Sequence, residues 1–132
     1  MHPEWLASLA SRGANVADGV VRDFGQAPRE RAATRAGSIV ADLSHLGVLA
    51  AGGADARAFL HGQLSCDVEG LTDETAVYGA YCTAKGRVLA NFLLWAEAGA
   101  FPMLLPRSIA SGIRKRLQMF VLRSHSPRVR SR

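Results

Sequence analysis

Two cations at one predicted turn are the residues of this chain best placed by type and spacing to bind a ligand. Lys85 and Arg87 flank Gly86 between two runs typical of strands, so a hairpin would carry both cations at its tip. Two cations beside backbone N–H groups can hold a carboxylate or a phosphate. The alternative is that basic residues simply keep a turn in solvent. This hairpin is the first candidate site.

Asn91 interrupts the otherwise apolar strand that follows the turn. A buried amide without a partner costs about 1 to 3 kcal/mol, so Asn91 either faces solvent through strand alternation or binds something. Counting by twos places Arg87, Leu89 and Asn91 on one face of the strand. Lys85, Arg87 and Asn91 are therefore the candidate ligand-binding residues.

The other reactive side chains match no catalytic or metal-binding motif. Cys66 and Cys82 are too few for a disulfide framework and lack metal-ligand spacing, so both are expected to be reduced thiols that pack as small apolar residues. The histidines share no metal spacing, and no nucleophile elbow, HExxH helix or P-loop occurs. Gln63 and Asp67 could meet the hairpin or cap the next loop. We predict no catalytic residue and no metal site.

The hydrophobic pattern predicts the elements that must position this hairpin. A short strand or irregular segment is expected within residues 15–26, and Gly37 should end the second helix. Asp55 and Ser108 are expected to cap the third and fourth helices, and Ile109, Ile113, Leu117 and Phe120 form an apolar stripe on the fourth. Helices are predicted over residues 3–12, 28–36, 56–64 and 109–120, and strands over 39–43, 47–51, 76–83, 87–96, 101–105 and from 121. Because neighbouring strands are joined by hairpins, the fold class is α+β with a mainly antiparallel sheet and flanking helices.

Size and charge suggest one domain with a basic end. The 132 residues are 48% hydrophobic, and we expect a single domain over residues 1–123. From Arg107 onward there are eight basic residues and no acidic one, against eight basic and eleven acidic residues before it. Residues 124–132 hold one aliphatic side chain and are predicted to be a basic, disordered tail. This end could contact phosphates, although the lack of interleaved aromatic residues disfavours sequence-specific nucleic-acid binding.

A membrane location is not indicated. The most apolar run, residues 88–106, is interrupted by Asn91, Glu97, Gly99 and Pro102 and cannot form an uninterrupted apolar span. The N-terminus has no basic region followed by an apolar core. We expect a cytoplasmic protein without a membrane partner.

Four segments in order, residues 41–44, 53–68, 80–92 and 116–124, resemble the YgfZ family, the folate-binding and tRNA-modification-linked relatives of the glycine-cleavage T-protein, an aminomethyltransferase. The resemblance implies the first part of the T-protein fold, tetrahydrofolate as cofactor, and support of iron-sulfur cluster assembly or repair. Through iron-sulfur enzymes it implies a link to tRNA modification. Lys85, Arg87 and Asn91 would approach the folate channel, with the cations suited to the glutamate tail of folate.

Two departures from the family limit what the resemblance implies. The aminomethyltransferase branch carries an aspartate pair where this chain has Ala90-Asn91, and asparagine cannot take up a proton as a carboxylate does. Glycine cleavage is therefore not expected, and whether the chain is an enzyme stays open. The family motif Lys-Gly-Cys-Tyr-x-Gly-Gln-Glu belongs downstream of the segment ending at Ser124 and is absent, so we expect an incomplete, N-terminal folate-binding domain. The alternatives are a basic nucleic-acid-binding or interaction module, or an aminomethyltransferase-related fragment without independent activity.

Overall fold

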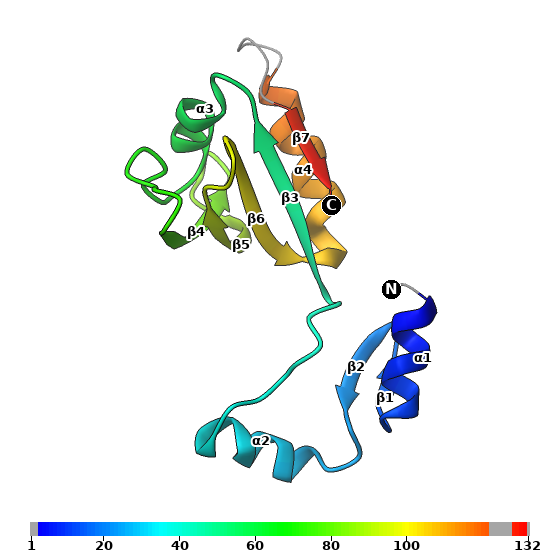
Figure 1. Cartoon of the computed structure of the whole chain (residues 1–132). Coiled ribbons are helices and arrows are strands. Elements are labelled where there is room, and N and C mark those ends of the chain that lie inside the picture. The colour runs from blue at the N-terminus through cyan, green and yellow to red at the C-terminus, as the bar shows by residue number, and fades with distance from the viewer. Residues whose placement is uncertain (1–2, 122–127, 132) are drawn as a thin grey trace. The chain divides into compact units, whose positions relative to one another are not determined.

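A computed structural model describes residues 3–121 and 128–131 of the chain (Figure 1). The chain divides into two compact units, residues 1–45 (unit 1) and residues 46–132 (unit 2). The single domain over residues 1–123 stays a prediction, and the boundary between the two compact units falls after His45 within it. The candidate hairpin belongs to unit 2.

Unit 1 is built from two helices and a small hairpin. Its elements are α1 (Pro3–Ser11), β1 (Asn15–Ala17), β2 (Val20–Asp23) and α2 (Ala27–Ala36). Asp18 and Gly19 join the antiparallel strands with φ values of 53° and 72°, the left-handed pair that a tight type I′ turn requires. The segment expected to be a short strand or irregular is therefore a hairpin.

The ends of α2 are closed by local hydrogen bonds. The Glu30 carboxylate accepts the backbone N–H groups of Phe24 and Gln26 at 2.9 and 3.0 Å, next to the first turn of the helix. At the other end the Gly37 N–H donates to the carbonyl of Ala33 at 3.2 Å. Gly37 thus follows the last helical residue, as predicted.

The strand predicted over residues 39–43 is wrong. In the described part of the chain, residues 38–45 belong to no strand, and Val40 is 97% exposed. The Asp42 carboxylate instead accepts hydrogen bonds from the Trp5 indole at 2.8 Å and from Ser44. Partial burial opposes ionisation of Asp42, but the hydrogen bonds from Ser44 and Trp5 outweigh it and lower the pKa of the carboxyl. An apolar, β-branched run forms a strand only where a neighbouring edge supplies backbone partners.

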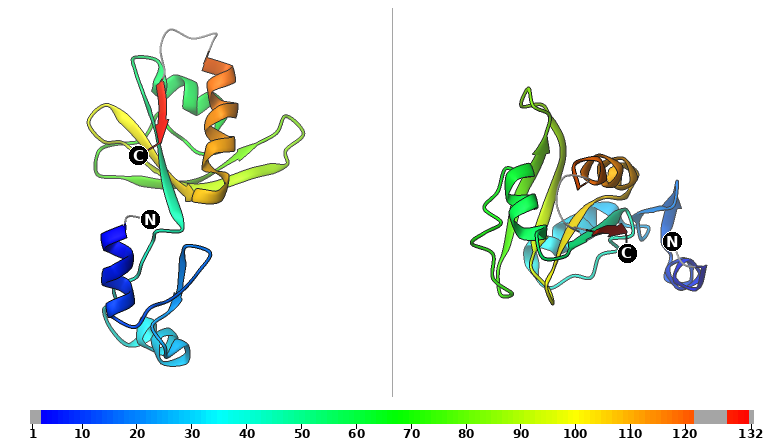
Figure 2. Two further views of the ribbon diagram at one scale, coloured as in Figure 1. Left: turned by 90° about the vertical axis from the view of Figure 1, so that its right-hand side faces the viewer. Right: turned by 90° about the horizontal axis from the view of Figure 1, so that it is seen from above.

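Unit 2 is an antiparallel sheet with two helices on one face (Figure 2). Each neighbouring pair in the strand order β4-β5-β6-β3-β7 is antiparallel. The elements are β3 (Leu46–Gly52), α3 (Ala56–Gln63), β4 (Ala76–Cys82), β5 (Val88–Trp95), β6 (Ala100–Pro106), α4 (Arg107–Val121) and β7 (Arg128–Ser131). The predicted α+β class with a mainly antiparallel sheet and flanking helices is confirmed.

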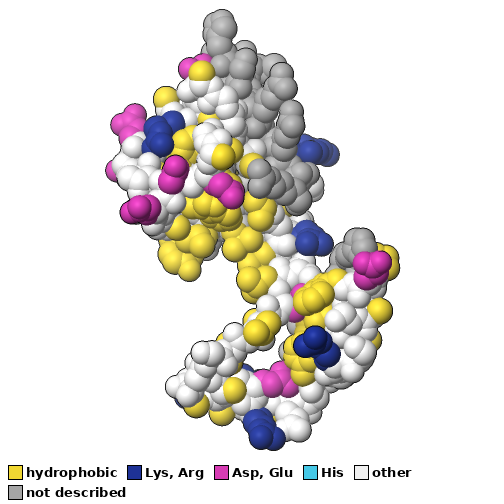
Figure 3. All heavy atoms as spheres, viewed as in Figure 1, with side chains coloured by type: hydrophobic (Ala, Val, Ile, Leu, Met, Phe, Trp, Pro, Cys, Tyr) yellow, Lys and Arg dark blue, Asp and Glu magenta, His cyan; other side chains and the backbone are white. Residues whose placement is uncertain are grey.

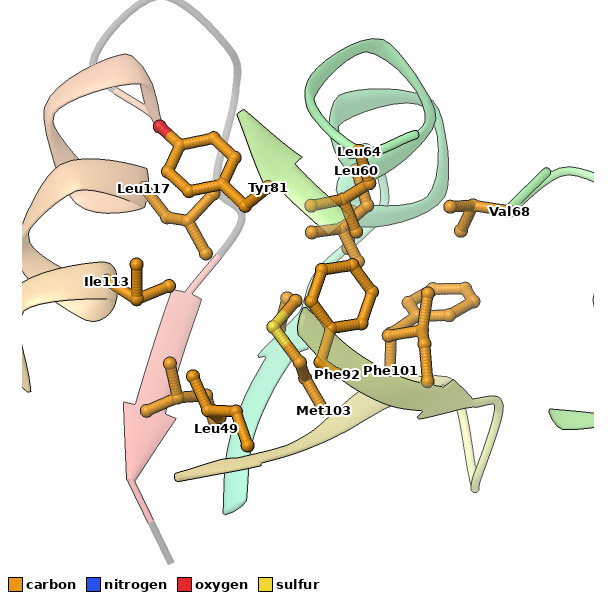
Figure 4. Close-up of a cluster of buried hydrophobic side chains, with 14 of the residues drawn as sticks. Leu49, Leu60, Leu64, Val68, Tyr81, Phe92, Phe101, Met103, Ile113 and Leu117 are labelled. Carbon is orange, nitrogen blue, oxygen red and sulfur yellow. The ribbon is translucent and has the colours of Figure 1, made fainter. Parts of the chain in front are cut away.

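The core of unit 2 lies between the sheet and its two helices (Figure 4). On α3 Leu60 is fully buried, and on α4 Leu117 is 1% exposed. Strand β5 alternates as its period of two requires: Phe92 and Leu94 are buried on the helix side, whereas Asn91 is exposed. Asn91 therefore lies on the sheet face opposite the helices.

That opposite face is largely apolar. Tyr78 of β4 is 85% exposed and pairs with Leu93, which in turn pairs with Leu104 of β6. Figure 3 shows hydrophobic side chains gathered over strands β4 to β6. The polarity of this sheet face therefore does not explain why Asn91 lies on it. The alternation of side chains along β5 does.

The predicted disordered tail is wrong where the structure describes it. Residues 128–131 form β7 and pair with β3, from Gly52 opposite Arg128 to Leu49 opposite Ser131. The open edge of β3 offers main-chain donors and acceptors, and these pair with a strand of almost any composition. Residues 124–127 and 132 lie outside the described residues. A strand was also predicted from residue 121. Val121 is instead the last residue of α4, and residues 122 and 123 are not described.

Two predicted helix caps differ from the structure. Asp55 occupies the position before α3, but its side chain makes no capping hydrogen bond. Helix α4 begins at Arg107, so Ser108 lies within its first turn instead of before it. None of the described helices is long and apolar enough to cross a bilayer.

Gly79 of β4 is a position where any side chain must collide with the core. A Cβ there would lie 2.6 Å from the Cys66 sulfur and 2.7 Å from the Phe92 ring. We expect Gly79→Ala to lower the free energy of unfolding by about 1 to 3 kcal/mol, because overpacking forces neighbours off their preferred rotamers. Thermal unfolding followed by circular dichroism measures the loss.

Gly112 provides the matched control for this substitution. It lies in α4, and a Cβ there would meet nothing within 4 Å. Gly112→Ala should raise stability by about 0.5 to 1 kcal/mol, since alanine loses less backbone entropy in a helix. Equal effects of the two substitutions would contradict the close packing at Gly79.

Candidate functional site

The predicted basic turn joins β4 to β5, and Thr83 organises it. The Thr83 N–H donates to the carbonyl of Arg87 at 2.8 Å, and its hydroxyl accepts the Arg87 N–H at 3.1 Å. The Gly86 N–H donates to the Thr83 carbonyl at 2.9 Å, and Gly86 has a φ of +76°. Because these N–H groups are already paired, an anion at this turn would be held by the Lys85 and Arg87 side chains.

A bulge in β5 changes the predicted relation between Arg87 and Asn91. Cys82 pairs with Val88, whereas Tyr81 pairs with Ala90, so Leu89 is an extra residue in the ladder. Such a bulge interrupts strict alternation. The count by twos that placed Arg87, Leu89 and Asn91 on one face is therefore wrong. The structure brings Lys85 and Arg87 to one exposed turn and puts Asn91 on the exposed sheet face.

A cleft of about 540 Å³ opens beside this turn, between α3, β4 and α4. One wall is the end of α3 with Ser65, whose N–H donates to the Ala80 carbonyl and whose hydroxyl accepts the Ala80 N–H at 2.8 Å. The lining residues are Gly62, Gln63, Leu64, Ser65, Ala80, Tyr81, Cys82, Thr83, Ala84, Leu89, Arg116 and Phe120. None of Lys85, Arg87 and Asn91 lines the cleft, although the turn carrying the two cations continues directly from Thr83 and Ala84.

The cleft has a cationic side and a buried phenol. Burial raises the pKa of Tyr81, and the positive charge of Arg116 partly offsets that rise. Arg116 is exposed and forms no salt bridge within the described part of the chain. Among the described residues that line the cleft, none is acidic. The site thus combines polar groups, apolar walls and the Arg116 guanidinium, which suits a planar ligand that carries negative charge.

Sequence reasoning missed two residues of this cleft. Phe120 was predicted to belong to the apolar stripe of α4, yet it is 49% exposed at the cleft. Arg116 was counted only among the eight basic residues from Arg107 onward, which could contact phosphates. Their spacing of four residues places both on one side of the helix, which is the signal that could have paired them. Gly62 to Leu64 of the α3 end complete the opposite wall.

The cysteines and Asp67 have separate roles. Burial raises the pKa of the Cys66 thiol, and the neighbouring Asp67 carboxylate adds to the effect, so this thiol is neutral near pH 7. Cys82 is half-buried in the cleft wall.

Asp67 accepts hydrogen bonds from the N–H groups of Glu69 and Gly70, so it caps the next loop, one of its two predicted roles. Gln63 lines the cleft together with residues of the hairpin. Within the described residues, no group of three or more His, Cys, Asp or Glu side chains could hold a metal.

The fold of the chain is that of the aminomethyltransferase T proteins. It matches the glycine cleavage system aminomethyltransferase T from Bartonella henselae with a TM-score of 0.81, over 97% of this chain and 37% of that one. The sequence identity is 18%, so this likeness defines the fold alone.

The sequence relatives identify the branch more closely: the chain is similar to the YgfZ family. It is 34% identical over 79 residues to the tRNA-modifying protein YgfZ of Colwellia psychrerythraea, covering 60% of this chain and 24% of that protein. It is 35% identical over 66 residues to the YgfZ protein of Vibrio vulnificus, and 35% over 57 residues to that of Escherichia coli O157:H7, covering 50% and 43% of this chain and 20% and 18% of those proteins. No protein-family model matches. The resemblance to the YgfZ family is confirmed, and the chain spans a quarter or less of these relatives' length.

Proposed function

We propose that this chain is a folate-binding part of a YgfZ-like protein and that the cleft beside the basic turn takes a reduced folate. The observation that carries the proposal is a partly apolar cleft that has Arg116 in its wall and opens beside the turn presenting Lys85 and Arg87. A folate has a planar pteridine ring at one end and glutamate carboxylates at the other. The ring would enter the cleft against Phe120, and the carboxylates would meet the cations.

The proposed role of the chain's own residues is binding, not proton transfer. Gln63 and the Ser65 and Thr83 hydroxyls offer donors and acceptors to ring nitrogens, while Leu64 and Leu89 exclude water from one wall. Ala90 is buried and Asn91 is an amide, so neither supplies a general base. Asn91 lies on the sheet face away from the cleft, so Asn91→Ala should leave the affinity for a folate in the cleft unchanged.

The wider role follows from the relatives. Proteins named tRNA-modifying protein YgfZ are the relatives of this chain, and the family resemblance implies folate-dependent support of iron-sulfur proteins. We infer that a protein containing this chain contributes to tRNA modification in the same indirect way, by maintaining iron-sulfur enzymes. The proposed compartment is the cytoplasm.

Isothermal titration of the full chain with 5-formyltetrahydrofolate, as the monoglutamate and the triglutamate, tests the proposal. An exposed ion pair contributes about 0.2 to 1 kcal/mol. Lys85→Gln combined with Arg87→Gln removes two such pairs and should therefore weaken triglutamate binding by up to about thirtyfold. The monoglutamate should lose less. Gln63→Ala should weaken both ligands equally.

The control variant also removes two positive charges, but from residues of unit 1 that do not line the cleft. Arg31 and Arg35 are exposed on α2 of unit 1, so Arg31→Gln combined with Arg35→Gln should leave both affinities unchanged. Absence of binding by the unmodified chain, or an equal loss in the two double variants, would contradict the proposal.

A further inference from the structure

One side of α4 carries two cations that form no salt bridge with a described residue, and two exposed apolar side chains. Lys115 and Arg116 are exposed, and the side chains of Met119 and Phe120 are 61% and 49% exposed. Residues four apart lie one above the other on a helix, so Lys115 neighbours Met119 and Arg116 neighbours Phe120. We call these four residues the α4 outer patch. We propose that the α4 outer patch binds single-stranded RNA, with Phe120 as a stacking platform for a base.

The cations of the patch are available to a ligand. Neither Lys115 nor Arg116 forms a salt bridge with any described residue. The sequence contains no acidic residue after Glu97, so α4 carries no carboxylate that would neutralise them. Unpaired cations on a surface without acids attract phosphates through release of condensed counterions. Charge complementarity therefore favours a polyanion as the partner.

The aromatic ring favours a nucleic acid over a polyanion without bases. An acidic peptide would bind through the cations and make no use of the ring. An exposed ring beside a guanidinium can instead stack a base while the guanidinium contacts the neighbouring phosphate. Phe120 lines the 540 Å³ cleft together with Arg116, so a base on the ring has room beside it. Bases in a duplex are stacked on each other and cannot reach such a ring. The partner is thus a single strand.

Both proposals use Arg116 and Phe120, but they can be tested separately because the patch extends beyond the cleft. Arg116 and Phe120 line the cleft, but Lys115 and Met119 do not. Lys115→Gln should weaken RNA binding and leave the folate affinity unchanged. Gln63→Ala, on the α3 wall, should weaken folate binding and leave RNA binding unchanged. The two proposals can therefore fail separately.

Fluorescence anisotropy of a labelled oligouridine, titrated with the full chain over a range of salt concentrations, tests the inference. Lys115→Gln should reduce the salt slope of log affinity by about 0.7, the value for one phosphate contact on a single strand. Phe120→Leu should weaken binding by roughly tenfold with an unchanged slope, because one stacked base is lost. Phe120→Tyr should retain the affinity, since tyrosine keeps the ring.

Three outcomes would overturn the inference. Equal binding by Phe120→Leu and the unmodified chain would show that no base stacks on the ring. Equal displacement of the RNA by polyglutamate would show a general anion surface. Equal affinity for a duplex RNA would exclude recognition of unstacked bases. Circular dichroism of each variant establishes that α4 is intact.

Discussion

Replacing Leu117 with alanine is expected to lower the free energy of unfolding by about 3 kcal/mol, within the range of 2 to 5 kcal/mol found for buried leucines. Leu117 is 1% exposed and packs from α4 into the cluster that contains Tyr81, Phe92 and Leu60 (Figure 4). The substitution removes apolar burial and leaves a cavity under the helix. Chemical denaturation followed by tryptophan fluorescence measures the loss.

The same substitution should impair the cleft, because Leu117 lies next in sequence to Arg116 and holds its helix against the sheet. Met119→Ala is the matched control: this side chain is 61% exposed, so its removal should change stability by less than about 0.5 kcal/mol. A Leu117→Ala variant as stable as Met119→Ala would contradict the packing of α4 on the core.

Replacing Arg57 with alanine is expected to have the second largest effect, a loss of about 2 to 3 kcal/mol. Hydrogen bonds to a charged group are stronger than neutral ones, and two partly buried carbonyls would be left unpaired. The Nη1 atom of Arg57 lies 2.8, 2.9 and 2.9 Å from the carbonyl oxygens of Val68, Glu69 and Leu71. Its guanidinium carbon lies 4.9 Å from the centre of the Phe101 ring, at cation–π distance. One side chain thus joins α3, the following loop and β6.

Hydrogen exchange locates this effect. In Arg57→Ala the backbone amides of residues 68–71 should exchange faster than in the unmodified chain, while amides of β6 beyond Phe101 keep their protection until global unfolding. Arg107→Ala is the control, since Arg107 makes one long side-chain hydrogen bond, 3.3 Å to the Leu46 carbonyl, instead of three short ones. Equal losses of stability in the two variants would argue against a special role of Arg57 in the loop.

Much of the secondary structure of unit 2 follows from local pattern. Alternating apolar residues predicted the strands around the basic turn, and the turn itself carries Gly86 at a positive φ, which glycine tolerates best. The α4 stripe was predicted correctly for Ile113 and Leu117, both buried. These features depend on residues close in sequence, so periodicity is enough to find them.

The predictions that were wrong concern features that depend on residues far apart in the sequence. Residues 39–43 have the composition of a strand but no partner edge, whereas residues 128–131 have the composition of a tail and pair with β3. Strand formation depends on a neighbour's backbone groups, which can come from residues far along the chain. Likewise the bulge at Leu89 arises from how β4 and β5 pair, and no count along one strand reveals it.

Local pattern was enough to find the hairpin with Lys85 and Arg87 at its tip and the motifs that resemble the YgfZ family. The folded arrangement was needed to place Asn91 on the sheet face away from the helices, and to show that Arg116 and Phe120 meet the end of α3 in a cleft. The turn is local and needs only a glycine and its flanking strands. The cleft is made by three elements separated in sequence, and their meeting depends on the burial of Leu60, Tyr81 and Leu117 in one core.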